Sequence, residues 1–136
     1  MEFTYSLDKI EEAAKWLLNQ AGSRKIVAFH GDLGAGKTTL IAAICKQLKV
    51  TEPVSSPTYP IINAYSNAAG EKIFHLDLYR LNSEQEAIEA GVEDCLVSGD
   101  LCLVEWPERL PGLFTGEVHC YISGAGPASR KLRIIS

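Results

Sequence analysis

The chain has 136 residues, of which 46% are hydrophobic and 22% are charged, and its formal net charge is −4. This length suffices for one domain with a packed core and is too short for two, so we expect a single domain over residues 1–136. Because lysines and arginines are scattered along an acidic chain, the sequence excludes a large basic face, and tight independent binding of RNA or DNA is not expected.

The sequence also argues against membrane insertion and against a secreted, disulfide-stabilised fold. No apolar run approaches the 18 or more residues of a membrane helix, and the acidic N-terminus lacks the basic start of a signal peptide. The four cysteines form no Cys-x-x-Cys pair, and three of them lie in apolar patterns. We therefore expect a cytoplasmic protein whose cysteines are buried free thiols.

The first half of the chain alternates strands with helices. Apolar residues recur at helical spacing in two stretches, and short apolar runs precede both. The predicted elements are a strand over 2–6, a helix over 7–21 that Ser6 caps and Gly22 ends, a buried strand over 25–29, a helix over 39–48 and a proline-rich loop over 51–60.

The second half predicts more strands than helices. The predicted elements are a hairpin of strands over 61–66 and 71–79, a helix from a capping box at 83–86 to about Gly91, a helical turn and loop over 91–99, an apolar strand over 101–104, a short helix over 107–110, and strands over 117–123 and 131–135. This order predicts an α/β fold: a three-layer, P-loop NTPase-like sandwich with a mixed, largely parallel central sheet.

The glycine-rich stretch between the first buried strand and the second helix has the phosphate-binding P-loop pattern, Gly31-x-x-x-x-Gly36-Lys37-Thr38. Glycines let the backbone turn its N–H groups inward as an anion nest, and the following helix adds the positive end of its dipole. Lys37 can then reach the β- and γ-phosphates, and the Thr38 hydroxyl can ligate Mg²⁺. The residues expected to contact nucleotide here are Asp32, Leu33, Gly34, Ala35, Gly36, Lys37, Thr38 and Thr39.

A nucleotide hydrolase needs a second Mg²⁺ anchor opposite the P-loop hydroxyl, normally a carboxylate at the end of an apolar strand. Asp77 and Glu105 are the candidates, and both should lie at the carboxyl edge of the sheet. Glu105 fits better, because its strand is apolar throughout, whereas the strand of Asp77 could lie at a sheet edge. One acid could hold the metal and the other could orient the attacking water.

Other polar residues have weaker signals. The loop around Thr58 is a candidate switch segment, although a proline-flanked turn before a strand would have the same sequence. Trp106, beside Glu105, could report nucleotide state, although core packing is the commoner role of a tryptophan. Arginines 80, 109 and 130 could neutralise phosphate charge, and solvation is the default for each. The histidines at 30, 75 and 119 lie in or beside apolar strands without metal-ligand spacing, so packing is expected for all three.

Four separated segments together resemble the bacterial TsaE (YjeE) family. They are Gly-Asp-Leu-Gly-Ala-Gly-Lys-Thr-Thr at 31–39, Ser-Pro-Thr-Tyr at 56–59, His-Leu-Asp-Leu-Tyr-Arg-Leu at 75–81 and Glu-Trp-Pro-Glu at 105–108. The resemblance implies one P-loop ATPase domain over 1–136, with ATP and Mg²⁺ as cofactors. It also implies TsaD and TsaB as partners in the threonylcarbamoyl modification of an anticodon-loop adenosine, with tRNA met only through that complex.

The resemblance also assigns roles by position. Lys37 would bind phosphate, Thr38 and Glu105 would hold Mg²⁺, and Asp77 would support hydrolysis. Thr58 would lie in the switch loop, and Trp106 would be the aromatic residue beside the metal carboxylate. Near the opening strand and the last loop, Thr4 and Arg130 would flank the nucleotide.

Three other functions share the P-loop. A small-molecule kinase needs a lid and an acceptor site, for which 136 residues leave little room. A GTP-type switch normally carries Asn-Lys-x-Asp, and no asparagine in this chain is followed by lysine. A non-enzymatic module could keep a nucleotide as a structural brace, and a turnover measurement would distinguish it from an ATPase.

Overall fold

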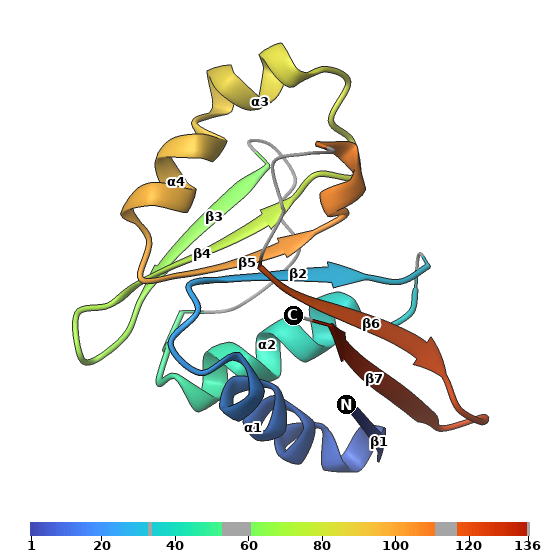
Figure 1. The fold of residues 1–136 in the computed structure, drawn as a ribbon. Coiled ribbons are helices and arrows are strands. Elements are labelled where there is room, and N and C mark those ends of the chain that lie inside the picture. The colour runs from blue at the N-terminus through green and yellow to red at the C-terminus, as the bar shows by residue number, and fades with distance from the viewer. Residues whose placement is uncertain (33, 53–60, 111–116, 136) are drawn as a thin grey trace.

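The computed structural model describes residues 1–32, 34–52, 61–110 and 117–135 (Figure 1). Seven strands join in one sheet, in the order β1-β7-β6-β2-β5-β4-β3. The strands are β1 Glu2–Ser6, β2 Ile26–His30, β3 Ile62–Ser66, β4 Lys72–Asp77, β5 Leu101–Glu105, β6 Val118–Gly124 and β7 Ser129–Ile135. The α-helices are α1 Ile10–Ala21, α2 Lys37–Gln47, α3 Glu84–Ala90 and α4 Val92–Ser98, and the 3₁₀ turns are η1 Leu7–Lys9 and η2 Pro107–Arg109.

The sheet is parallel at its centre and antiparallel at both sides. Strands β6, β2, β5 and β4 run parallel to one another, whereas β3 pairs with β4, and β7 and β1 extend the other side, in antiparallel register. The predicted mixed sheet is therefore confirmed. The sheet-edge position considered for the strand of Asp77 is wrong, because β4 lies between β5 and β3.

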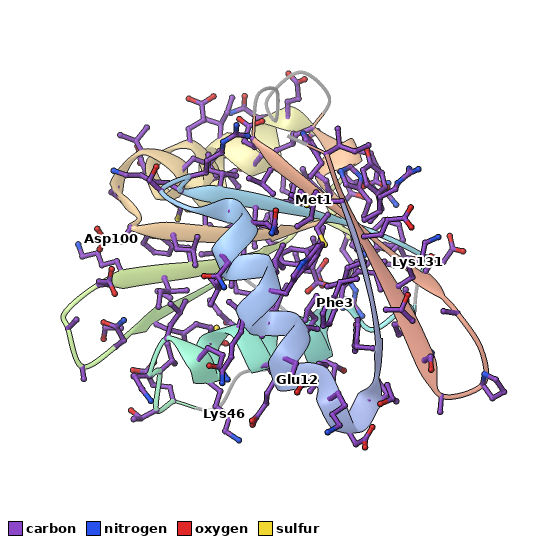
Figure 2. The ribbon with its side chains drawn as sticks, turned by 60° about the horizontal axis from the view of Figure 1, so that its bottom comes forward. Met1, Phe3, Glu12, Lys46, Asp100 and Lys131 are labelled. Atoms are coloured by element: carbon purple, nitrogen blue, oxygen red, sulfur yellow. The ribbon has the colours of Figure 1, made fainter. Side chains whose placement is uncertain are left out.

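Helices cover the sheet on both faces and make the predicted three layers (Figure 1). On one face, α1 and α2 bury a core that includes Leu17, Ile41 and Leu103. On the other, α3 and α4 cover a smaller core that includes Leu76 and Val104. The edge strand β1 is tied to the first of these faces, because Phe3, labelled in Figure 2, stacks on Trp16 of α1 with ring centroids 5.2 Å apart.

Three helix boundaries differ from the sequence expectation. The helix α2 begins at Lys37, two residues before the predicted start. The first helix begins as the 3₁₀ turn η1, and the Ser6 hydroxyl donates to the Asp8 carboxylate without capping a backbone N–H. The short turn expected after Gly91 is the helix α4, because Gly91 at φ 86° ends α3 and lets the chain restart at Val92, which is buried. The capping residue Ser83 accepts from the Glu86 N–H as predicted.

The cysteines, the hairpin and the proline-rich loop were also subjects of the sequence analysis. All four cysteines are free; Cys45, Cys102 and Cys120 are buried, and Cys95 is partly exposed. Within the described ranges no helix is both long and apolar enough to span a membrane. The hairpin of β3 and β4 forms as predicted. Most of the proline-rich loop, including Thr58 of the expected switch segment, lies outside the described residues.

Candidate functional site

The P-loop lies between the end of β2 and the start of α2, and its glycines are required by geometry. Gly36 has φ 103°, a conformation that strains residues with a side chain. A Cβ on Gly31 would lie 2.9 Å from the Ile122 carbonyl oxygen, so the loop packs directly against β6. The Ala35 N–H donates to the Asp32 carbonyl at 2.9 Å and closes the turn. The loop therefore leads into the N-terminus of α2, where unpaired N–H groups favour anions.

A cavity of about 240 Å³ opens beside the N-terminus of α2. Residues from α2 and from the carboxyl ends of β4 and β5 contribute to it, which is where ligands bind in parallel α/β sheets. Its lining residues are Gly34, Gly36, Lys37, Thr38, Thr39, Asp77, Tyr79, Glu105 and Trp106. The sequence thus predicted most of this cavity, except for Tyr79. Of the other loop residues expected to contact nucleotide, Asp32 and Ala35 do not line it, and Leu33 is outside the described residues.

Two predicted carboxylates lie side by side at this cavity. Asp77 and Glu105 are register partners on the parallel strands β4 and β5. Glu105 is only 3% exposed, and the Thr38 hydroxyl donates to its carboxylate, with oxygen–oxygen distances of 3.1 and 3.2 Å. Hydroxyl and carboxylate oxygens are the ligands that Mg²⁺ prefers, so this donor set fits that ion.

The environment of Asp77 disfavours its charged form. The side chain is half-buried, and its desolvation raises the pKa of the carboxyl group above the usual range. The neighbouring charge of Glu105 acts in the same direction, and the hydrogen bond from the Tyr79 N–H, 3.1 Å from Oδ1, acts against it. Asp77 is therefore a carboxylate whose proton affinity is increased at the edge of the cavity.

Lys37 is an almost fully buried cation, with 4% of its surface exposed. Its ammonium group donates to the Gly31 carbonyl and lies 3.5 Å from the ring centroid of Trp106. Burial lowers the pKa of Lys37, and the carboxylates of Glu105 and Glu108 oppose that shift. The lysine side chain is therefore held within the P-loop by a carbonyl and an aromatic face.

Trp106 forms part of the wall of this cavity. Its φ of 58° is left-handed, a conformation that a bulky residue rarely adopts and that costs free energy. Its ring lies 4.8 Å from that of Tyr79, and the Arg109 guanidinium lies 5.6 Å from the Tyr79 ring. An aromatic pair thus connects the buried lysine to an arginine of η2.

Arg130 and Thr4 were both expected near the nucleotide, and the structure places them differently. The Arg130 Nε donates to the Ala35 carbonyl at 3.1 Å, so this side chain lies against the P-loop. Thr4 is exposed on β1 in register with Lys131. Neither residue lines the 240 Å³ cavity. Arg80, another candidate for phosphate contact, is exposed after β4.

The comparisons with known proteins agree with these motifs. The family model described as "Threonylcarbamoyl adenosine biosynthesis protein TsaE" matches residues 4–132. The chain belongs to the TsaE family. A Haemophilus influenzae protein named "tRNA threonylcarbamoyladenosine biosynthesis protein TsaE" is 41% identical over 65% of this chain and 55% of its own length, and a Nostoc protein of the same name is 36% identical over 84% and 70%.

A solved structure shows the same fold. The crystal structure of YdiB from Bacillus subtilis has a TM-score of 0.75 and 25% sequence identity, over 97% of this chain and 82% of that one. The chain therefore spans most of YdiB and little more than half of the Haemophilus TsaE protein.

Sequence reasoning missed His75, which lies in the family motif on β4. This histidine is fully buried, as the expected core packing requires, but its Nε2 also lies 2.6 Å from Oε2 of Glu105, a contact that was not predicted. The missed signal was the two-residue period of a strand, which places His75 on the same face as Asp77. Asp77 and Glu105 are register partners on neighbouring parallel strands, so the Glu105 side chain projects from that same face of the sheet.

The other two histidines line or adjoin a second cavity, on the β6 side of the P-loop. The packing expected for them is also incomplete, since both are partly exposed and His30 Nε2 lies 2.8 Å from Nδ1 of His119. The His30 ring stacks on Tyr121 with centroids 4.4 Å apart. This cavity has about 350 Å³ and is lined by Glu2, His30, Gly31, Asp32, Tyr121, Ile122, Ser123, Lys131 and Arg133.

Proposed function

We propose that this TsaE-family chain binds ATP and hydrolyses it in the presence of Mg²⁺, as part of the threonylcarbamoyl modification of tRNA. The observation that carries the proposal is the contact between the Thr38 hydroxyl and the Glu105 carboxylate, at 3.1 and 3.2 Å, in a cavity that also holds Lys37. A hydroxyl at the start of a P-loop helix and a strand-end carboxylate are the protein ligands that P-loop hydrolases use for Mg²⁺.

Phosphate binding follows from the loop and the buried lysine. The N–H groups at the N-terminus of α2 carry partial positive charge, and Lys37 adds a full charge that burial leaves poorly screened. A triphosphate would replace the Gly31 carbonyl and the Trp106 ring as the partner of the Lys37 ammonium group. The exchange favours the phosphate, because its oxygens are negatively charged, whereas the Gly31 carbonyl and the Trp106 ring are neutral partners of the ammonium group.

Thr38 and Glu105 would hold the metal ion. When bound, Mg²⁺ supplies positive charge that neutralises the phosphate oxygens during bond cleavage. Among the described residues, no group of three or more His, Cys, Asp and Glu side chains could hold a metal ion. Thr38 and Glu105 would supply two ligands, and Mg²⁺ commonly takes phosphate oxygens and water as the others.

Asp77 would act on the attacking water. The water oxygen would form a bond to the γ-phosphorus as the bond from that phosphorus to the bridging oxygen breaks, which yields ADP and phosphate. The proton that the water loses would leave on the phosphate product or pass to solvent. A carboxylate with a raised pKa accepts a hydrogen bond from water more strongly than an ordinary aspartate does, so Asp77 can orient this water beside Glu105.

The proposal includes dependence on partners. In the described part of the chain no arginine lines the cavity, Arg130 is bonded to the Ala35 carbonyl, and Arg109 lies over Tyr79. Hydrolases of this kind gain much of their rate from an arginine at the γ-phosphate, so turnover by the isolated chain is expected to be slow. By its family, the chain would assist TsaB and TsaD in the cytoplasm and would meet tRNA only through them.

ADP release from ATP tests this function directly. We expect Mg²⁺-dependent turnover that rises when TsaB and TsaD are added, and binding of ATP in preference to GTP. Phosphate transfer to a metabolite in place of water would favour the kinase alternative. A fast basal rate that TsaB and TsaD leave unchanged would contradict the partner dependence, and cells lacking the protein should lose the tRNA modification.

A further inference from the structure

Among the described residues, a buried histidine makes a shorter polar contact with Glu105 than Thr38 does. His75 is fully buried on β4, and its Nε2 lies 2.6 Å from Oε2 of Glu105 on the neighbouring strand. The Thr38 hydroxyl lies farther from the same carboxylate, at 3.1 and 3.2 Å. The Glu105 carboxylate therefore contacts His75 of the neighbouring strand β4 and Thr38 at the start of α2.

The hydrogen-bond pattern indicates the direction of this contact. Among the described residues, the buried Nδ1 of His75 has no hydrogen-bond partner. With the ring proton on Nε2, the imidazole donates to Glu105 and Nδ1 is a bare acceptor. With the proton on Nδ1, a buried donor would be unpaired and the carboxylate would face a second acceptor, which is the more costly arrangement.

The same pattern argues against a purely structural histidine. An apolar side chain of similar size would fill this position without burying an unpartnered nitrogen, and cores normally satisfy their polar groups. The unpartnered Nδ1 of His75 therefore destabilises the core, whereas Nε2 forms one specific bond to Glu105. Together with the Thr38 hydroxyl, that bond restricts the rotation of the Glu105 carboxylate.

We propose that His75 is a positioning residue that orients the Glu105 carboxylate for Mg²⁺. This inference rests on the proposed function. His75 contacts Glu105 and does not line the cavity, so it would act through that carboxylate, in the way that residues behind a metal ligand set its direction and basicity. Loss of the bond should weaken Mg²⁺ binding while leaving metal-free nucleotide binding intact.

A matched pair of variants tests the proposal. His75→Met fills the space without a donor, and His75→Gln places an amide N–H near the position of Nε2. The readouts are ADP affinity in EDTA, the Mg²⁺ concentration that half-saturates the ADP complex, and Mn²⁺ binding followed by electron paramagnetic resonance. His119→Met is the control, because His119 is a strand histidine that bonds to His30 and not to Glu105.

His75→Met should raise the half-saturating Mg²⁺ concentration by about 10- to 100-fold with ADP affinity in EDTA unchanged, and His75→Gln should recover most of that loss. A folded His75→Met chain with wild-type Mg²⁺ dependence would overturn the inference and leave the proposed function in place. If the wild-type chain itself shows no Mg²⁺-dependent nucleotide binding, the proposed function fails first.

A measurement on the wild-type chain covers the case in which His75→Met does not fold. We expect the ¹⁵N signals of the His75 ring to show the Nε2–H tautomer in the ADP complex, and to shift when Mg²⁺ is added. An Nδ1–H tautomer, or ring signals that Mg²⁺ leaves unchanged, would contradict the proposal.

Discussion

Two cavities adjoin the P-loop, and they differ in how their charged groups are satisfied. The cavity of about 350 Å³ is the larger, and its polar side chains pair with one another: His30 stacks on Tyr121, and Lys131 lies 3.5 Å from Glu2. The cavity of about 240 Å³ contains Lys37 and Glu105, both nearly buried, together with Thr38 and Asp77. Cavity size alone would therefore favour the cavity that lacks Lys37, Thr38 and Glu105.

The two cavities thus differ in the burial of their charged groups more than in volume, and burial is the physical basis on which the smaller cavity is proposed as the site. A buried charge costs free energy unless binding uses it, whereas the exposed pairs around the larger cavity cost little. Burial lowers the pKa of Lys37 and raises that of Asp77 in the smaller cavity, and it also lowers the pKa of His30 at the larger one. The smaller cavity therefore differs in holding two shifted groups of opposite charge, Lys37 and Asp77. Perturbed groups of this kind cluster at functional sites.

The largest expected effect is on turnover. Glu105→Gln keeps the shape of the side chain and removes its charge, so Mg²⁺-dependent ATP hydrolysis should fall by about 100-fold, equivalent to about 3 kcal/mol of transition-state stabilisation. ATP affinity measured in EDTA should change little. The control is Glu2→Gln at the larger cavity, where turnover should remain at the wild-type level; an active Glu105→Gln enzyme would show that the wrong acid was chosen.

Nucleotide affinity should respond next. Lys37→Ala removes a buried cation from the P-loop, and ATP binding measured by calorimetry should weaken by about 10- to 100-fold, because hydrogen bonds to charged groups contribute about 1.5–3 kcal/mol. Lys131→Ala makes the same change at the larger cavity and should leave the affinity unaltered. Equal losses in the two variants would remove the distinction between the cavities.

A third prediction concerns stability, because Gly31 starts the P-loop and also lines the larger cavity. The added Cβ of Gly31→Ala would lie 2.9 Å from the Ile122 carbonyl oxygen, so the loop must move away from β6. We expect the free energy of unfolding to fall by about 1–3 kcal/mol in urea titrations. Gly126→Ala is a contrast, since no atom lies within 4 Å of its added Cβ, and its loss would come from φ 140° alone. An unchanged stability of Gly31→Ala would contradict the close packing of the loop on β6.

The smallest effect is a pH-dependent gain in stability. Burial raises the pKa of Asp77 in the folded chain, so the ionised carboxylate destabilises the fold as pH rises through that value, and the penalty is absent below the unfolded pKa of about 4. Asp77→Asn should therefore be more stable than wild type at pH 7 and unfold at a higher temperature. The gain in the free energy of unfolding should be less than about 1 kcal/mol, because solvent screens a half-buried group. The gain should vanish near pH 3.

The exposed Asp32 provides the control for this prediction. Asp32→Asn at the rim of the larger cavity should leave the free energy of unfolding within about 0.5 kcal/mol of wild type at both pH values. An Asp77→Asn variant that is less stable than wild type at pH 7 would show that its carboxylate is held by favourable contacts. Asp77 would then not be an acid destabilised by burial, and the contrast between the two cavities would be weaker.

Much of the fold was predictable because local patterns and tertiary structure agree. The P-loop between a buried strand and a helix, the hairpin of β3 and β4, and the apolar strand that ends in Glu105 all formed as predicted. The capped helix ending at Gly91 did so as well. The helix α4 was underestimated, because its first residue, Val92, is buried by packing against elements distant in the sequence.

The sequence by itself determined which chemical groups this protein possesses: a glycine-rich loop with the P-loop pattern, a hydroxyl at the start of a helix, and acids at two strand ends. Spacing along the chain suffices for these, since a P-loop is a local structure whose glycines and lysine must be adjacent.

Only the tertiary structure decided which groups meet. The parallel register of β4 and β5 brings His75 to Glu105, and the approach of α2 brings Thr38 to the same carboxylate. The left-handed backbone of Trp106 directs its ring toward Lys37, although the sequence there predicts no such conformation. These contacts depend on strand register and helix packing, which are set by burial across the whole sheet and not by neighbouring residues.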